Sequence, residues 1–509
     1  MFADLLNGFI FIFQPFTLLM LVFGVAVGLI VGAIPGITGS IGIILMLPMV
    51  FRLPNEVAMV MLCGLFCGSM LGGSFSAILL NTPGTPSAAA TSLDGYPLAQ
   101  QGKAGKAMGV AVFASFIGGL ISTIALVFIA PQLSRVALQF HAADYFSLAI
   151  FGLTMIGASA GKNVLKGLIS GVVGMLIATI GVDAVLGTAR FTFGSVALMN
   201  GLPLLSVLIG VFAVSEVFET ITKRGDGQVK ANAQDVKKVM PTLKEMREIA
   251  KATGISGVIG VSIGIVPGTG GAISSFLSYN IAKKMSKNPE KFGHGSLEGI
   301  AAAESANNGT TGGAMIPMLT LGIPGEVITS VMLGALILIG VRPGPLLMVE
   351  NSALVYAIFA GMFVIQFAMF GFGMAFARFS PLVLKIPRTM LMPIVIVLSV
   401  VGAFSIANQL YHVYITLIFG VIGIVMRRYG YPGAPLVLGL ILGPLAESNL
   451  NRAMQITRND WTVLFQRPIS LTFLLLAALF IFMTVRSNAK EKEREAQKSQ
   501  ETQEGGMQA

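Results

Sequence analysis

The sequence predicts an all-α polytopic membrane protein. Of 509 residues, 54% are hydrophobic and only 11% are charged, whereas charged residues make up about 25% of an ordinary globular domain. The stretches 16–33, 110–130 and 354–377 contain no Lys, Arg, Asp or Glu. Several such stretches reach the ~20 apolar residues that a helix needs to cross a hydrocarbon core. We expect about ten to thirteen transmembrane segments, some of them re-entrant or broken by glycine and proline.

The first break in an apolar run has a partner far along the chain. "GAIPGITGSIGIIL" (Gly32–Leu45) reaches Pro-Gly, and the pattern recurs 232 residues later in "GIVPGTGGAISSFL" (Gly264–Leu277). A second Pro-Gly, in "LLNTPGTP" (Leu79–Pro86), recurs 241 residues later in "TLGIPGEV" (Thr320–Val327). Two motifs in the same order at nearly the same offset indicate an internal duplication into two halves.

The breaks point to a binding site. Proline removes a backbone donor and glycine permits conformations that other residues avoid, so Pro-Gly interrupts a helix. Non-helical backbone at membrane depth is satisfied only inside protein or around a watery cavity. Discontinuous helices at matching positions of two halves are the sequence pattern of a transporter site. A single Pro-Gly is well explained as a packing kink, but matched pairs favour a site.

Positive charge marks the topology. Eight Lys and Arg residues fall between Lys223 and Lys251, and cytoplasmic loops carry such an excess, so we place this loop inside. Lys283, Lys284 and Lys287 follow the second-half break, which suggests a re-entrant hairpin with both ends cytoplasmic. The first-half break lacks this charge, and inverted repeats fit the difference. Nucleic-acid binding is not needed to explain the net charge of +10.

These observations give a domain map. We expect a first transmembrane repeat (1–219), a basic cytoplasmic loop (220–251), a second repeat (252–426), a C-terminal transmembrane addition (427–486) and a charged tail (487–509).

The breaks share one chemistry. Their hydroxyl and amide groups can donate to a carboxylate, and backbone carbonyls exposed by unwinding can coordinate Na⁺. Helix N-termini after each Pro-Gly suit anions. No Lys or Arg lies within the motifs, so neutral donors, dipoles and co-bound cations would hold an anionic substrate. The candidate substrate- and ion-binding residues are Gly36, Thr38, Gly39, Ser40, Asn81, Thr82, Pro83, Gly84, Thr85, Gly268, Thr269, Gly270, Ser274, Asn307, Asn308, Thr310, Thr311 and Gly325.

Two acidic residues are candidates for coupling. Glu304 lies in the small-residue segment "ESANNGTTGG", where an ionisable group at membrane depth is costly and suggests function. Asp94 follows the first Pro-rich break. For both, the alternative is a charge that faces an aqueous loop.

Other chemistry finds little support. Cys63 and Cys67 lack the His or carboxylate partners of a metal site, and the three histidines are scattered. No catalytic Ser–His arrangement and no G-x-x-x-x-G-K-[ST] motif occurs. We therefore expect neither an enzyme nor an ATP-driven pump, and no cofactor beyond Na⁺ or H⁺ as the coupling ion.

The long motifs resemble a known family. "GAIPGITG", "GSFSAILLNTPGTPSAAATSLDGYPLAQQGKAGKA", "GIVPGTGGAISSFLSY", "ESANNGTTGGAMIPMLTLGIPG", "GVRPGPLL" and "YPGAPLVLGLILGPLAESNLNRA" are together similar to the large membrane subunit of the tripartite tricarboxylate transporters, the TctA type. The resemblance covers about Gly24 to Ser470 and leaves out the charged tail.

The resemblance implies a secondary transporter of the bacterial inner membrane that takes up di- or tricarboxylates or related organic acids. It also implies a small membrane subunit of the TctB type and a periplasmic solute-binding protein of the TctC type as partners. Uptake would be driven by a Na⁺ or H⁺ gradient, with one repeat-built bundle moving as in elevator-type carriers. A carboxylate or ion channel without gradient coupling is the alternative.

Overall fold

The computed structural model describes residues 2–158, 164–183, 185–222, 239–384, 388–405, 408–484 and 486. Apart from one two-stranded hairpin, the regular structure of these residues is helical, which confirms the all-α prediction. The basic stretch 223–238 and the predicted tail 487–509 lie outside the described residues.

The described helices are those of a multi-pass membrane protein. Six are long and apolar enough to cross a bilayer: Pro15–Ala33, Asn55–Leu80, Pro86–Ala137, Ser352–Val383, Leu410–Arg428 and Gly433–Ile456. Further apolar helices of 10–17 residues accompany them, which suits chains that enter a bilayer without crossing it. The total of ten to thirteen segments remains a prediction.

The chain forms two compact units. Unit 1 comprises Met1–Gln139 and Pro203–Ile424. Its elements are α1 (Phe2–Ile12), α2 (Pro15–Ala33), α3 (Gly39–Val50), α4 (Asn55–Leu80), η1 (Pro86–Ala88), α5 (Ala89–Leu98), η2 (Ala99–Lys103), α6 (Ala104–Ala137), α10 (Leu204–Leu208), η3 (Ile209–Val214), α11 (Ser215–Thr222), α12 (Leu243–Gly264), α13 (Gly270–Met285), η4 (Pro289–Lys291), α14 (Leu297–Leu321), α15 (Val327–Leu338), α16 (Leu347–Glu350), α17 (Ser352–Val383), α18 (Arg388–Ser405) and most of α19 (Leu410–Arg428).

Unit 2 comprises Phe140–Leu202 and Val425–Ala509. Within it, α20 (Gly433–Ile456) packs against α7 (Ala142–Ala158) and α8 (Val164–Ala178). Arg467 Nη2 lies 2.9 Å from Oδ2 of the buried Asp144, which ties the segment after α21 (Val463–Gln466) to α7. The remaining elements are β1 (Gly181–Val182), paired antiparallel with β2 (Ala189–Arg190), and α9 (Val196–Met199).

All four predicted helix breaks are present in unit 1. α2 ends at Ala33 and α3 begins at Gly39, and the turn between them passes through Gly36 at φ 91°. α12 ends and α13 begins around an equivalent turn at Gly268, with φ 80°. A side chain with a Cβ adopts this left-handed region at a cost, which explains glycine after each proline.

α4 and α14 also end alike. The residue after α4 is Asn81 at φ 52°, and the residue after α14 is Gly322 at φ 70°. Asn and Gly are the residues that most readily adopt the left-handed conformation at a helix C-terminus. Each is followed by a short irregular segment containing Pro-Gly before the next helix begins.

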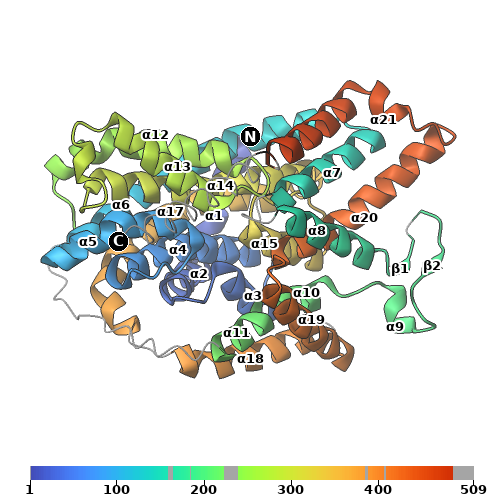
Figure 1. Cartoon of the computed structure of the whole chain (residues 1–509), viewed down its shortest axis with the longest axis horizontal. Coiled ribbons are helices and arrows are strands. Elements are labelled where there is room, and N and C mark those ends of the chain that lie inside the picture. The colour runs from blue at the N-terminus through green and yellow to red at the C-terminus, as the bar shows by residue number, and fades with distance from the viewer. Residues whose placement is uncertain are drawn as a thin grey trace, which may run out of the picture. The chain divides into compact units, whose positions relative to one another are not determined.

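The helix pairs that precede the breaks pack in matched fashion. α2 lies along α4, and α12 lies along α14 (Figure 1). In both pairs, glycines bring one helix against backbone carbonyls of the other, so that an added Cβ would collide with them. The matched contacts are Gly28 on Leu65 and Gly260 on Ala306; Gly32 on Ser69 and Gly264 on Thr310; Gly72 on Leu29 and Gly313 on Val261; and Gly84 on Gly32 and Gly325 on Gly264.

Candidate functional site

The start of α13 meets the break that follows α4. A Cβ built on Gly271 would lie 2.9 Å from Ser87 Cβ, 3.1 Å from Met70 Cε and 3.3 Å from Asn307 Oδ1. Ser87 lies in η1, and its hydroxyl is 3.1 Å from that of Thr85. Three of the predicted motifs therefore contribute to one buried region, with α13 pointing its N-terminus into it.

The two breaks of the second half are joined by backbone. Gly268 N–H donates to the Gly325 carbonyl at 2.8 Å. Thr269 Oγ1 is 2.6 Å from the Ile263 carbonyl and 2.8 Å from the Val266 carbonyl, which satisfies groups at the end of α12. Ser274 donates to the Gly271 carbonyl at 2.9 Å. The Thr269 and Ser274 hydroxyls thus stabilise the broken helix itself.

The candidate residues of the first half differ in burial. Gly39, Ser40, Gly84 and Thr85 are buried, whereas Asn81 is exposed. The Thr38 and Ser40 hydroxyls lie 2.7 Å apart at the start of α3. Gly39 lies against Ile328 of α15, with the Ile328 Cδ1 atom 2.9 Å from where a Cβ would be. Thr82 donates to the Leu80 carbonyl at 3.2 Å. Asn81 is exposed and also holds the left-handed turn, so a test of its amide needs a replacement that keeps this conformation, such as Asn81→Gly.

The segment "ESANNGTTGG" lies inside the continuous helix α14 and is fully buried. The Thr310 and Thr311 hydroxyls donate to carbonyls of their own helix, at 2.6 and 2.7 Å. Asn307 Nδ2 lies 3.1 Å from the Met70 carbonyl of α4. Because a carbonyl only accepts, this contact fixes the amide so that Oδ1 faces the start of α13.

Several buried polar atoms at this place have no partner within the described part of the chain. They are Asn307 Oδ1, both amide atoms of Asn308, the Ser275 and Ser278 hydroxyls of α13, and Glu326 Oε1. Native proteins leave few buried polar groups unpaired, because each costs about 1–3 kcal/mol. These atoms of α13, α14 and the break before α15 are therefore available to a ligand.

Glu304 is completely buried and surrounded by neutral donors. The Thr91 hydroxyl of α5 bonds to Oε1, and the Ser115 hydroxyl of α6 donates to Oε2 at 3.1 Å. Asn307 Nδ2 lies 3.4 Å from the same Oε2 atom. Hydroxyls can accept as well as donate, so this cage suits a carboxylate and a carboxylic acid. In the described residues, no lysine or arginine pairs with Glu304.

The Asp94 side chain binds backbone N–H groups of the loop before α14. Its Oδ1 accepts from the N–H groups of Gly293, Gly295 and Ser296, each at 2.8 Å. Ser296 is the N-cap of α14, so Asp94 fixes the entry of that helix against α5. This geometry gives Asp94 a structural role, and its coupling role remains a prediction.

Sequence reasoning missed three residues of this region: Thr91, Ser115 and Glu326. The two hydroxyls lie in small-residue helices where nothing in the sequence marks them as partners of Glu304. Glu326 gave a signal, because it is a charged residue directly after Pro-Gly. The described residues contain no group of three or more His, Cys, Asp or Glu side chains that could hold a metal ion.

The fold and the site define a multi-pass helical membrane protein whose interior polar groups gather at helix breaks. Residues 18–438 match the family model of the tripartite tricarboxylate transporter TctA family, and the chain belongs to this family. It is thus a membrane component of a tripartite transporter and not an enzyme.

Two relatives come from Agrobacterium vitis, and both are uncharacterized. One is a 52.8 kDa protein in the TAR-I ttuC' 3'region, 37% identical over 96% of this chain and 97% of its own length. The other, in the TAR-II ttuC' 3'region, is 38% identical over 46% of this chain and 96% of its own length. No solved structure matches the chain significantly.

Proposed function

We propose that this chain is the translocating subunit of a binding-protein-dependent secondary transporter that takes up di- or tricarboxylates. A small membrane subunit and a periplasmic solute-binding protein of the tripartite system would complete it in the bacterial inner membrane. A Na⁺ or H⁺ gradient drives uptake. The observation that carries the proposal is the meeting of α13, η1 and Asn307 at a buried region with unpartnered polar atoms.

The matched packing supports an internal duplication. Glycines at offsets of 232 and 241 residues make equivalent contacts in the pairs α2–α4 and α12–α14. Gly39 of α3 touches Ile328 of the second half, while Gly271 of α13 touches Ser87 of the first half. Such reciprocal exchange suits two inverted repeats, and broken helices in inverted repeats suit alternating access by rocking or elevator movement.

The chemistry of the region supports an anionic substrate. The hydroxyls of this region can donate hydrogen bonds, and the first N–H groups of α13 attract negative charge.

Transport in proteoliposomes tests the proposal. The chain is reconstituted with its small membrane subunit, the binding protein is added outside, and a panel of labelled di- and tricarboxylates is offered. Na⁺ and pH gradients are imposed separately. We expect one of them to drive accumulation of a carboxylate above its outside concentration. Equilibration without accumulation would instead identify a channel, and no flux of any carboxylate would reject the substrate class.

A further inference from the structure

Glu326 places a negative charge at the N-terminus of α13. It directly follows Gly325, whose carbonyl accepts from Gly268 just before α13. Glu326 Oε2 lies 3.9 Å from the position of a Cβ on Gly270, and the carboxylate interacts with the backbone N–H of Gly271. The first N–H groups of a helix have no intrahelical partner and attract anions. Glu326 is also the N-cap residue of α15 and shares a capping box there with Thr329. Its carboxylate therefore lies between two helix N-termini, at a place where an external anion would also bind.

A second observation marks the same place as a ligand position. Asn307 Oδ1 is fully buried, faces Gly271, and has no partner in the described chain. The Ser275 hydroxyl, on the next turn of α13, is equally buried and unpartnered. An amide oxygen only accepts, so Asn307 Oδ1 suits a hydroxyl group of the substrate or a cation that accompanies its carboxylate, whereas the Ser275 hydroxyl can donate.

The charge is specific to the second half. The residue 241 positions before Glu326 is Thr85. Thr85 is neutral, and its hydroxyl lies 3.1 Å from that of Ser87. The equivalent break therefore carries no carboxylate, although its backbone packs in the same way.

We propose that Glu326 is an internal anion that occupies the N-terminus of α13 and is displaced by a carboxylate group of the substrate. This inference rests on the proposed function. Two carboxylates at the same N–H groups repel each other at close range, so only one occupies the helix end. A built-in competitor lowers the apparent affinity for substrate and, by returning, assists release.

Substrate affinity tests the competition. Glu326→Gln and Glu326→Thr are made in the intact transporter complex, and binding of radiolabelled citrate is measured by scintillation proximity. Because the competing charge is lost, we expect the Kd for citrate to fall about tenfold and the maximal uptake rate to fall as well. Glu350→Gln, at an exposed position on α16, is the matched control and should change neither. Unchanged citrate binding in the Glu326 variants would overturn the proposal. Weaker citrate binding would also overturn it, because Glu326 would then be a binding partner of the substrate or of its cation.

Amide exchange tests the contact without any substrate. In Glu326→Ala, the amides of residues 268–276 should exchange faster than in the wild type, and saturating citrate should restore their protection. Equal exchange in both proteins would overturn the inference even if citrate is transported. If the wild type binds no carboxylate, the proposed function fails and the displacement step fails with it, while the exchange difference still reports whether Glu326 covers α13. Melting curves of each variant confirm that it is folded.

Discussion

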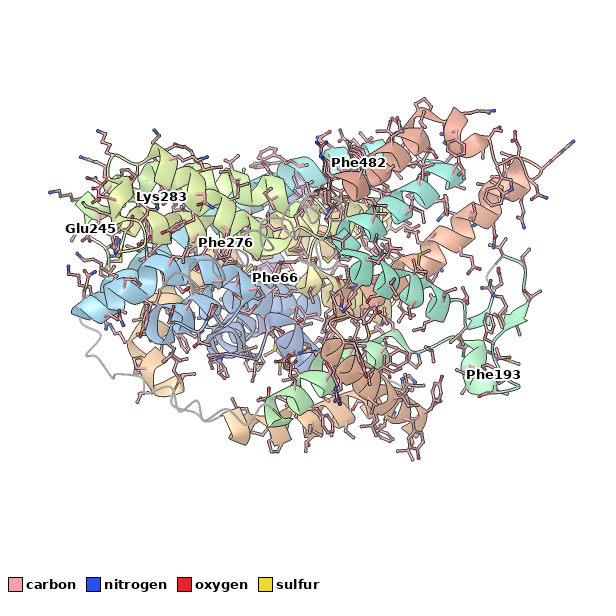
Figure 2. The ribbon with its side chains drawn as sticks, viewed as in Figure 1. Phe66, Phe193, Glu245, Phe276, Lys283 and Phe482 are labelled. Atoms are coloured by element: carbon pink, nitrogen blue, oxygen red, sulfur yellow. The ribbon has the colours of Figure 1, made fainter. Side chains whose placement is uncertain are left out.

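The helices α4 and α14 pack alike but carry different chemistry. Each is lined by glycines that contact the backbone of α2 or α12 at matched positions. Facing the interior, α14 presents Glu304, Asn307 and Asn308, whereas the residues 241 positions earlier on α4 are Cys63, Phe66 and Cys67. All six are fully buried, and Figure 2 labels Phe66 within unit 1.

The difference shows that the packing distance between two helices and the polarity of their side chains can vary independently. Glycine contacts fix how close two helices lie, and they depend only on backbone shape. The side chains between these glycines are free to be apolar in one half and polar in the other. In the first half, α4 then serves as a packed wall that supplies single groups, such as the Met70 carbonyl to Asn307. The polar side chains of that half come from η1, α5 and α6 instead.

The largest effect should come from breaking the shared packing. In Gly32→Leu and Gly264→Leu, the new Cβ would collide with the backbone around Ser69 or Thr310, which has no room to move. We expect a loss of about 3 kcal/mol or more and little folded protein in both. Size-exclusion profiles of detergent extracts measure this. Gly254→Leu, also on α12 but with nothing within 4 Å, is the control and should fold. A well-folded Gly264→Leu variant would show that the two pairs are not equivalent.

The next effect should separate the chemistry of the two helices. Asn308→Leu keeps the branched shape and the number of heavy atoms but removes both amide atoms, which have no protein partner in the described chain. We expect at least about tenfold lower uptake from folded protein, because a hydrogen bond to a charged ligand is lost. The matched Cys67→Ala should change uptake by no more than about twofold, since its thiol makes only weak contacts, with Met362 Sδ at 3.9 Å and with the Gln366 amide at 3.8 Å. Equal losses in both variants would contradict the assignment of the site to α14.

A third variant sharpens the role of the buried acid. Glu304→Gln retains the shape of the side chain, and the Thr91 and Ser115 hydroxyls can rotate to accept from its amide. We expect citrate binding to stay within severalfold of wild type, while gradient-driven accumulation falls by about tenfold or more. Proteoliposome uptake with and without the gradient measures both quantities. Cys63→Ala at the matched position should leave the gradient response intact. Normal accumulation in Glu304→Gln would remove Glu304 from coupling.

The smallest effect concerns the first turn of α12. Glu245 lies beside α6 (Figure 2), where its carboxylate pairs with Lys106. The Lys106 ammonium and, to a lesser degree, the Thr242 N–H lower the pKa of Glu245 from its ordinary value of 4.5. A lowered pKa contributes stability that is present above 4.5 and is lost as the pH falls through the folded-state pKa. Glu245→Gln should therefore lower stability by about 1 kcal/mol or less at pH 7. The difference in melting temperature should shrink toward zero at pH 3, and a gap that persists there would exclude the ion pair as its cause.

Much of the fold was predictable because its signals are local. Apolar length predicts membrane helices, and each Pro-Gly predicts a break near its own position; all four breaks occur where expected. The segment "ESANNGTTGG" was predicted to lie at membrane depth, which stays a prediction, and the structure buries it inside α14. The predicted domain boundaries remain untested, and the structure groups 140–202 with the C-terminal part of the chain. Which segments form one compact unit depends on contacts between residues far apart in the sequence, and local composition does not reveal such contacts.

The sequence by itself determined the class of protein, the positions of the breaks and the residue types that line them, because hydropathy and backbone preference act within a few residues. Only the tertiary structure decided which groups meet. Thr91 reaches Glu304 across 213 residues, and Asp94 reaches the loop before α14 across about 200. The approach of Glu326 to the start of α13 is likewise a product of packing. A helical pattern tells which face a side chain occupies, but the partner opposite that face depends on how the helices pack.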